Sequence, residues 1–508
     1  MSNCEFSINN DFNNATQVNL AYLKLTINND PSISVNLDHT YRDGDCIKFF
    51  FDDELSESED LLLLNHINTY VYIANTIRPV SEIFPAIVSN DPDTGDFTSI
   101  VAAFNSGKTS VYVRNGVYFE PSNIIVPKGG QLIGESYGAV YIYGKGVTVD
   151  ATSGVYEDSG TISINSNSKA VVGTGTTFTN LSIGEYIMIG NNYLEIDSIT
   201  DDTHLNIKTT FKGKNITNDT YIAQNMYTGI GLANFIVVGS MTEGLFIRGV
   251  RHSTFKSIAC DSCIGSNIKI SEIGDCMLDT FVAGNGYSHG IEVSNCIDVL
   301  LDVCNIHNNS GSGIIVNGIS NFIAICRCTS TSNSLNGIHI TDTSSEVNVL
   351  NTYTKLNSAN GIKADVNTDR LLFSNCICND NALSGIEIKS INATITSSII
   401  RENDLYGVCV IDESQVSNNQ ISHNDRGVCC EGHDISILGN NITHNTSDGI
   451  YIDGDNNSIT NNISRDNVTG INITNTSSYN NIIANQVRNN TTDINNLGSN
   501  NSLVNNIT

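Results

Sequence analysis

The sequence has no tryptophan, six prolines and only 25 lysines and arginines among its 508 residues. The 53 aspartates and glutamates bring the formal net charge to −28, and no run of basic residues occurs. Nucleic acid is therefore excluded as an expected ligand, because phosphate contacts require clustered lysine and arginine. An aromatic content of 7% leaves few rings for sugars to stack on, which argues against a processive polysaccharide enzyme.

Long apolar segments are also missing. The runs at 100–104 and 322–326 are typical of the longest, whereas a membrane-spanning helix needs about 20 apolar residues. The N-terminal stretch MSNCEFSINNDF has neither a basic region nor an apolar core. We therefore expect no signal peptide and no insertion into a membrane.

Fourteen cysteines are present, but their spacing is not that of a disulfide framework or a zinc ribbon. The pairs Cys326/Cys328 and Cys376/Cys378 are Cys-x-Cys, whereas zinc ribbons use Cys-x-x-Cys. Free thiols that pack as small apolar side chains, in a protein made in a reducing compartment, explain this scatter. We therefore expect no metal site and no cofactor.

Repetition is the most abundant feature of the chain. A glycine followed by alternating apolar residues recurs from Gly290 to Gly470 at intervals of 20 to 24 residues, and DGIYI at 448–452 returns as TGINI at 469–473. Short strand-like runs fill each interval and leave no room for a helix of ten residues. A repeat of this kind predicts one turn of a parallel β-helix per interval, with about eleven turns after residue 225. Glycine is expected to form the tight corner before each strand, and asparagine to occupy corners in the left-handed conformation.

Residues 90 to 150 have a different pattern. A short amphipathic helix is predicted at 96–104, followed by Asn-Gly-x-Tyr at 115–118, Pro-x-Gly at 127–129 and Leu-Ile-Gly at 132–134. In this order, the elements resemble the N-terminal cap of right-handed parallel β-helix proteins of the pectate-lyase-like superfamily, which includes many viral tailspikes. The resemblance implies a fold rather than an activity, because this superfamily contains lyases, hydrolases, epimerases and inactive fibres.

Residues 160–222 interrupt the repeats with short, closely spaced strands, which predict a small β-barrel. A Gly-Thr-Gly-Thr turn at 173–176 and the strand that starts at Gly184-Glu-Tyr-Ile resemble an insertion module of phage tail and spike proteins. Before residue 80, strands are expected at 18–35 and 47–51, and a capped helix is expected to begin at Ser56. This segment more loosely resembles modules of virion proteins.

The predicted fold is all-β: a right-handed single-stranded parallel β-helix with an inserted small β-barrel and a separate N-terminal module. The expected parts are an N-terminal α+β module at 1–80, the cap and first turns at 81–155, the barrel at 156–224, and a long β-helix at 225–508.

Candidate catalytic groups occupy outward positions of the repeats. The turns from 337 to 389 place His339, Lys363, Asp365, Glu387 and Lys389 on one strip. Asp365 and Glu387 are expected about 8 Å apart between their backbones, exposed, with His339 nearby. Paired carboxylates act as acid and base in glycoside hydrolysis. An ordinary ladder of surface ion pairs is the simpler interpretation, because both lysines neighbour Glu387.

The resemblance implies a virion surface protein, either a tailspike-like fibre or a receptor-binding one, made in the host cytoplasm. It would bind a cell-surface or capsular glycan, attach to other virion proteins through the N-terminal module, and form a homotrimer. Outward apolar residues such as Ile315, Ile411 and Tyr451 also favour a face covered by other subunits. The alternatives are a polysaccharide-degrading or -modifying enzyme, as a glycoside hydrolase or lyase, and an intracellular scaffold.

Overall fold

The computed structural model describes residues 3–7, 37–43, 46–51, 86–151, 158–189, 192–224 and 226–508. The chain divides into two units, Met1–Pro85 and Ala86–Thr508. In the first unit, β3 (Cys46–Phe51) lies between β1 (Asn3–Ser7) and β2 (Leu37–Asp43) in an antiparallel sheet. The strand expected at 47–51 corresponds to β3. The strands expected at 18–35 and the helix expected from Ser56 lie outside the described residues.

The second unit begins with a short helix and the first strands of a solenoid. In α4 (Ile100–Asn105), the Ser99 hydroxyl caps the helix by accepting a hydrogen bond from the Ala102 N–H. The first strands are β4 (Ala86–Val88), β5 (Ser110–Val113), β6 (Gly116–Glu120), β7 (Ile124–Ile125), β8 (Gln131–Gly134), β9 (Val140–Gly144) and β10 (Val147–Asp150). Within the described ranges, no helix has the length and apolar character needed to cross a membrane.

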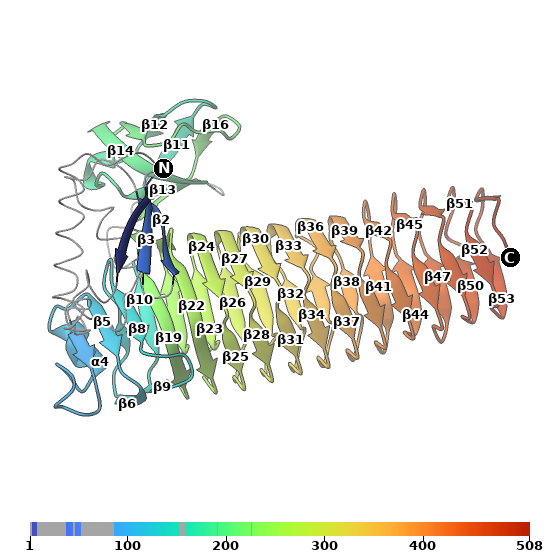
Figure 1. Ribbon diagram of the computed structural model, residues 1–508. Helices are drawn as coiled ribbons and strands as arrows, with labels where there is room; N and C mark the ends of the chain where they lie inside the picture. Colours follow the sequence, from blue (N-terminus) through green and yellow to red (C-terminus); the bar gives the residue numbers. More distant parts are fainter. Residues whose placement is uncertain are drawn as a thin grey trace. The chain divides into compact units, whose positions relative to one another are not determined.

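One face of each turn belongs to a 14-stranded parallel sheet, which we call the glycine sheet because the repeat glycines precede or begin most of its strands. It starts with β7 and β10. It continues with β20 (Leu245–Arg248), β23 (Ile268–Ser271), β26 (Ile291–Ser294), β29 (Ile314–Asn317), β32 (Ile338–Ile340), β35 (Ile362–Ala364), β38 (Ile386–Ile388), β41 (Tyr406–Val410), β44 (Arg426–Cys430), β47 (Asp448–Ile452), β50 (Thr469–Ile473) and β53 (Thr492–Asn496). Figure 1 shows these strands side by side from green to red.

The other two faces of each turn form two further parallel columns, joined into one sheet of 30 strands. The columns are joined where β19 (Gly231–Val238) and β22 (Thr254–Asp261) bend and pair in both. The second column continues through β24 (Gly274–Asp279), β27 (Ile297–Asp302), β30 (Asn321–Cys326), β33 (Ser345–Leu350), β36 (Asp369–Ser374), β39 (Ile391–Thr396), β42 (Gln415–Ser417), β45 (Ser436–Leu438), β48 (Ser458–Thr460), β51 (Asn481–Ile483) and β54 (Ser502–Val504). The third continues through β25 (Val282–Gly284), β28 (Asn305–His307), β31 (Thr329–Thr331), β34 (Tyr353–Lys355), β37 (Ile377–Asn379), β40 (Ile399–Arg401), β43 (Gln420–Ser422), β46 (Asn441–Thr443), β49 (Ile463–Arg465) and β52 (Gln486–Arg488).

The predicted parallel β-helix is therefore confirmed as a stack of turns with three faces. After the insertion, the glycine sheet has one strand more than the eleven turns expected from the sequence. The additional strand is β53, in which Asp493 lies next to Gly470 and takes the place of a repeat glycine. Because the expected turns were counted from the repeat glycines, this last copy, which has no glycine, was not among them.

The repeat glycines are required by close contact between turns. A Cβ atom on Gly361 would lie 2.6 Å from the carbonyl oxygen of Gly385 and 2.8 Å from Nδ2 of Asn381. None of the repeat glycines from Gly290 to Gly470 has a positive φ angle. Repeat glycines at five positions stand at bends just before their strands, as expected: Gly290, Gly313, Gly337, Gly361 and Gly385. The repeat glycines from Gly407 to Gly470 lie within strands instead. At all of these positions, what excludes a side chain is the neighbouring turn.

Buried asparagines form ladders along the stack. The Oδ1 atom of Asn381 accepts hydrogen bonds from the backbone N–H of Asn357 at 3.2 Å and from its Nδ2 at 3.0 Å. The longest ladder contains Asn309, Asn333, Asn357, Asn381, Asn403, Asn424, Asn445, Asn467 and Asn490. A second contains Asn419, Asn440, Asn462, Asn485 and Asn506. Other asparagines, such as Asn375, occupy corners with positive φ as expected. The asparagine content thus satisfies buried backbone groups as well as corners.

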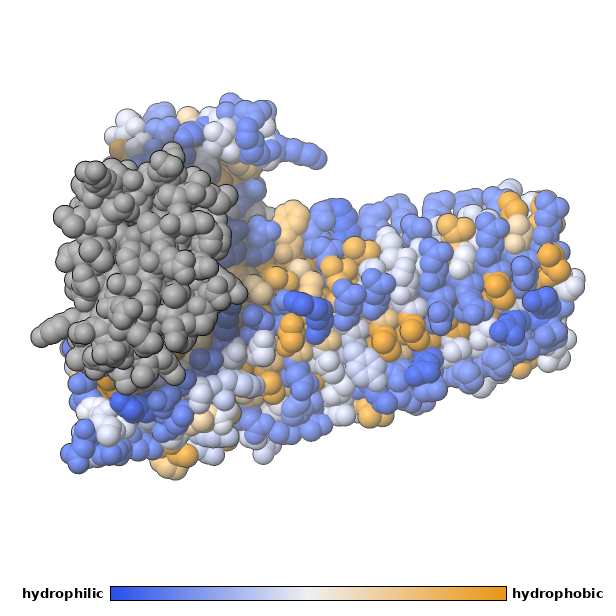
Figure 2. All heavy atoms as spheres, in the orientation of Figure 1, coloured by the Kyte–Doolittle hydropathy of each residue, from blue (hydrophilic) through white to orange (hydrophobic). Residues whose placement is uncertain are grey.

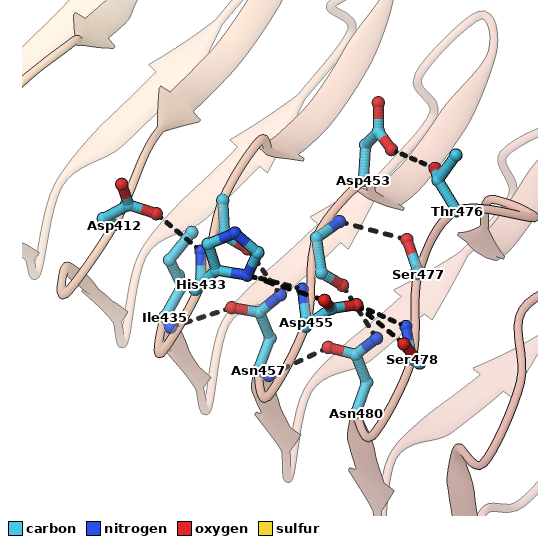
Figure 3. A network of polar contacts seen from close by, with 12 residues as sticks. Asp412, His433, Ile435, Asp453, Asp455, Asn457, Thr476, Ser477, Ser478 and Asn480 are labelled. Carbon is cyan, nitrogen blue, oxygen red and sulfur yellow. Dashed lines mark hydrogen bonds and ion pairs between the residues drawn. The ribbon is translucent and has the colours of Figure 1, made fainter.

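Carboxylates at the corner after the glycine sheet are also bonded between turns, as Figure 3 shows. Asp412 accepts a hydrogen bond from the His433 N–H at 2.7 Å. Asp455 accepts from the N–H and the hydroxyl of Ser478 at 2.7 and 3.0 Å. These acids bond backbone N–H groups of the following turn, so their role here is structural.

The inserted residues form a seven-stranded antiparallel sheet with its own apolar core. In spatial order, its strands are β16 (Ile216–Asp219), β11 (Thr161–Ile164), β12 (Ala170–Thr174), β15 (His204–Ile207), β14 (Asn192–Asp201), β13 (Tyr186–Ile189) and β17 (Ile222–Gln224). Phe178, Ile187 and Ile207 are fully buried in that core. Among the described strands, β16 and β17 are the two edges of the sheet that the sequence predicts as a small β-barrel.

Candidate functional site

The outer face of the glycine sheet carries the residues that the sequence singled out. In β32, Ile338 and Ile340 are fully buried, so His339 between them points outward. His339 pairs in register with Lys363 of β35, which in turn pairs with Glu387 of β38. Alternation along the strand and register between turns thus bring the three outward side chains into one row.

Asp365 follows β35 and contacts two members of this row. Its Oδ2 lies 2.9 Å from Nε2 of His339, and its Oδ1 lies 3.1 Å from Nζ of Lys363. Partial burial by itself would raise the pKa of Asp365, but hydrogen bonds from Lys363, His339 and Thr341 lower it below the ordinary 3.8. Asp365 is therefore ionised at neutral pH, which suits a base or a hydrogen-bond acceptor and not an acid.

Glu387 is held by a different set of partners. Its Oε2 accepts a hydrogen bond from Asn360 Nδ2 at 3.1 Å, and its Oε1 lies 3.4 Å from Nζ of Lys389. The side chains of Asp365 and Glu387 are 29% and 17% exposed, so the expectation of two exposed carboxylates is wrong. Side chains from neighbouring turns cover them because successive strands lie only about 4.8 Å apart.

The two lysines form ion pairs within single turns, whereas the simpler interpretation was a ladder of ion pairs between turns. Each lysine of the strip binds the carboxylate two residues away on its own turn: Lys363 binds Asp365, and Lys389 binds Glu387. Among the ion pairs of the described residues, none joins Lys363 to Glu387, although the two lie side by side in the sheet. We call His339, Lys363, Asp365, Glu387 and Lys389 the polar strip.

A second polar cluster on the glycine sheet was not identified from the sequence. The guanidinium carbon of Arg426 lies 4.1 Å from the ring centre of Tyr451 and 5.9 Å from that of Tyr406. Its Nε lies 3.2 Å from Oδ2 of Asp448. Tyr406, Arg426 and Asp448 each stand immediately before a repeat glycine. This position within the repeat was the signal that could have found them.

One group of side chains on the same sheet has donors suited to a metal ion. The ligand atoms of Cys409, Cys429 and Glu431 all lie within 4.8 Å of one another. The twelve cysteines whose side chains the structure describes are all free thiols, as the sequence predicts.

Two family models match parts of the chain. Residues 289–437 match the family described as "Right handed beta helix region", and residues 390–507 match the one described as "Periplasmic copper-binding protein (NosD)". The three parallel faces show a parallel β-helix fold, and the first match, over part of the chain, identifies the right-handed form. No curated protein matches the chain significantly.

Solved structures of similar fold include bacterial and phage proteins. The A-module of mannuronan C-5 epimerase AlgE4 from Azotobacter vinelandii is 15% identical, with a TM-score of 0.41, over 83% of this chain and 98% of that one. The Gp54 tailspike of Acinetobacter baumannii bacteriophage AP22, solved with a capsular saccharide, is 12% identical, with a TM-score of 0.44, over 78% and 76%. The tailspike gp61 of Pseudomonas phage phi297 is 11% identical, with a TM-score of 0.44, over 76% and 68%. These similarities concern the fold alone.

Proposed function

We propose that the chain is a virion surface protein that binds a cell-surface or capsular glycan along the outer face of the glycine sheet. The observation that carries this proposal is the polar strip. The carboxylates, lysines and imidazole of the strip are held in place by contacts with one another and with Asn360, and they remain partly exposed. Side chains held in place before binding lose little conformational entropy when they bind the hydroxyl groups of a sugar.

The repetition of the sheet suits an elongated ligand. Outward positions recur on every turn, so a polymer that lies along the solenoid meets a series of comparable contacts. The ring of Tyr406, one turn beyond Glu387, and that of Tyr451, two turns further, each contact Arg426. Their remaining apolar faces suit the packing of sugar rings. Figure 2 shows hydrophobic side chains scattered among hydrophilic ones along the visible surface of the solenoid.

The virion location rests on the resemblance of residues 90–150 and 160–222 to parts of spike proteins. We assign attachment to other virion proteins to the N-terminal module.

A homotrimer belongs to the same proposal, but the residues that support it differ from those expected from the sequence. Ile315 is only 9% exposed within the single chain and needs no covering partner. Ile377 and Ile399 of the third column, each 38% exposed, are better candidates for a face covered by other subunits.

A glycoside hydrolase or polysaccharide lyase is the second candidate. It is favoured by the 2.9 Å contact of His339 with Asp365, which keeps an ionised carboxylate beside an imidazole on an accessible sheet. Asp365→Asn and Glu387→Gln distinguish the two functions. If the protein is an enzyme, the wild type releases product from the glycan and both variants lose this turnover. If the protein only binds glycans, the wild type releases no product.

Two measurements test the proposal. The full chain is immobilised and exposed to a panel of purified polysaccharides of acidic, neutral and amino-sugar composition, and saturable binding to at least one is expected. Antibodies against the chain should detect it in purified virus particles. Absence from particles, with abundance in the host cytoplasm, would remove the virion assignment, and no binding across the panel would remove the glycan assignment.

A further inference from the structure

Two cysteines of the glycine sheet differ in direction from the described thiols that point into the core of the solenoid. Nine of the twelve belong to the apolar core of the solenoid, including Cys430. The two neighbours of each cysteine along its strand are in that core. They are Val408 and Val410 for Cys409, and Val428 and Cys430 for Cys429. By strand alternation, Cys409 and Cys429 therefore lie on the outer side of the sheet.

The two thiols are direct neighbours on consecutive turns. Cys409 of β41 pairs in register with Cys429 of β44, so their side chains stack along the solenoid. A carboxylate joins them from the same side, since the Cys429 thiol donates a hydrogen bond to Oε1 of Glu431 at 3.3 Å. Glu431 comes two positions after Cys429, directly after β44 ends at Cys430, so alternation directs both side chains outward.

We propose that Cys409, Cys429 and Glu431 form a binding site for a thiophilic cation of the Zn²⁺ or Cu⁺ type. Thiolates select such cations over Mg²⁺ and Ca²⁺, which prefer oxygen donors. In a tetrahedral zinc site, two sulfur atoms about 2.3 Å from the metal lie about 3.8 Å apart. Donor atoms already within 4.8 Å reach this spacing by small side-chain rotations.

The site is enclosed but has an approach from solvent. Both cysteines are buried, whereas Glu431 is exposed. Contact with Cys409, followed by burial and the charge of Glu431, raises the pKa of Cys429. Binding forms two metal–sulfur bonds and one metal–oxygen bond and releases two protons, without any redox step. Such a site goes beyond glycan binding and contradicts the expectation of no metal.

The test uses the full chain, reduced with a phosphine and freed of metal. Co²⁺ serves as a spectroscopic substitute for Zn²⁺, and we expect one Co²⁺ per chain, a thiolate-to-cobalt charge-transfer band, and displacement by Zn²⁺. Cys429→Ser should weaken Zn²⁺ and Cu⁺ binding at least about 100-fold. Glu431→Gln should weaken Zn²⁺ about 10-fold and leave Cu⁺ nearly unchanged, because Cu⁺ favours sulfur over oxygen.

Cys326→Ser is the matched control, since Cys326 is a half-buried thiol outside the group and its loss should leave both affinities unchanged. Thermal unfolding of each metal-free variant checks that it is folded. Absence of the charge-transfer band in the wild type would overturn the proposal, and this result depends on no variant. Equal losses in Cys326→Ser and Cys429→Ser would overturn it as well.

Discussion

Asp365 is the residue on which the polar strip depends most. It contacts His339 and Lys363, and these hydrogen bonds outweigh the effect of its partial burial on its pKa. Charged hydrogen bonds of this kind are stronger than neutral ones, but screening by water reduces their contribution where side chains are partly exposed. Its carboxylate thus positions His339 and Lys363 beside the path that we propose for a glycan.

We predict that Asp365→Asn lowers the free energy of unfolding by about 1 kcal/mol at pH 7, because the amide loses the charged hydrogen bonds. Urea unfolding at low and high salt measures this change, which should shrink as salt rises. Glu402→Gln, at an exposed corner, is the control and should change stability by less than about 0.5 kcal/mol. A loss in Asp365→Asn no greater than in the control would contradict the prediction.

His289 gives the protein a pH dependence near neutrality. Burial lowers its pKa from the ordinary 6.5, and its Nδ1 accepts a hydrogen bond from the Ser312 N–H at 3.0 Å. The folded state thus binds fewer protons than the unfolded state, so this contribution to stability is complete above pH 6.5 and is lost as pH falls through the lowered pKa. Between pH 7.5 and 5.5, His289→Gln should reduce the change of the unfolding midpoint with pH. The same substitution at the exposed His252 should leave that change as in the wild type. An unchanged slope in His289→Gln would show that another group is responsible.

Which residues point outward was predictable from the sequence; which of them bind each other was not. Alternation after each glycine placed His339, Lys363 and Glu387 in one row. The partner of Lys363 depends on side-chain rotamers and on Asn360, which already bonds Glu387. The outward positions of Cys409 and Cys429 also follow from this alternation, but their contact with Glu431 depends on side-chain rotamers that the sequence does not reveal.

At the level of elements, stacked asparagines join each turn to the next. Asn381 is 1% exposed; its Oδ1 accepts two hydrogen bonds from Asn357, and its Nδ2 donates to Asn403 Oδ1 at 2.9 Å. Removing one member leaves polar groups of two neighbouring turns unsatisfied in the interior. Strand period and glycine spacing predicted the turns, but ladders depend on contacts between turns that a single repeat does not reveal.

Asn381→Ala should lower the free energy of unfolding by about 2 to 4 kcal/mol, because it orphans buried donors and acceptors and leaves a small cavity. Asn441→Ala, which removes an exposed asparagine of the third column, is the matched control and should cost less than about 0.5 kcal/mol. Chemical denaturation measures both. Similar losses in the two variants would contradict a structural role for the ladder.

At the scale of the whole molecule, a solenoid presents three long faces. We assign the glycine sheet to the glycan and the third column to neighbouring subunits. Sedimentation of the purified full chain should give about three times its mass of 54.8 kDa. Ile377→Lys together with Ile399→Lys should reduce the trimer to monomer, because both lie side by side in the third column. A stable monomer of the wild type at micromolar concentration would remove the trimer.

The most direct measurement compares two lysines on different faces of the solenoid. Lys363 of the glycine sheet lies 3.1 Å from Asp365, and Lys355 of the third column lies 3.3 Å from Asp380, so each forms an ion pair with an aspartate. Affinity for a polysaccharide that the wild type binds is measured for Lys363→Ala and Lys355→Ala. We predict a loss of about tenfold or more for Lys363→Ala and less than twofold for Lys355→Ala. Equal losses, or a loss in Lys355→Ala alone, would contradict the assignment of the glycine sheet as the binding face.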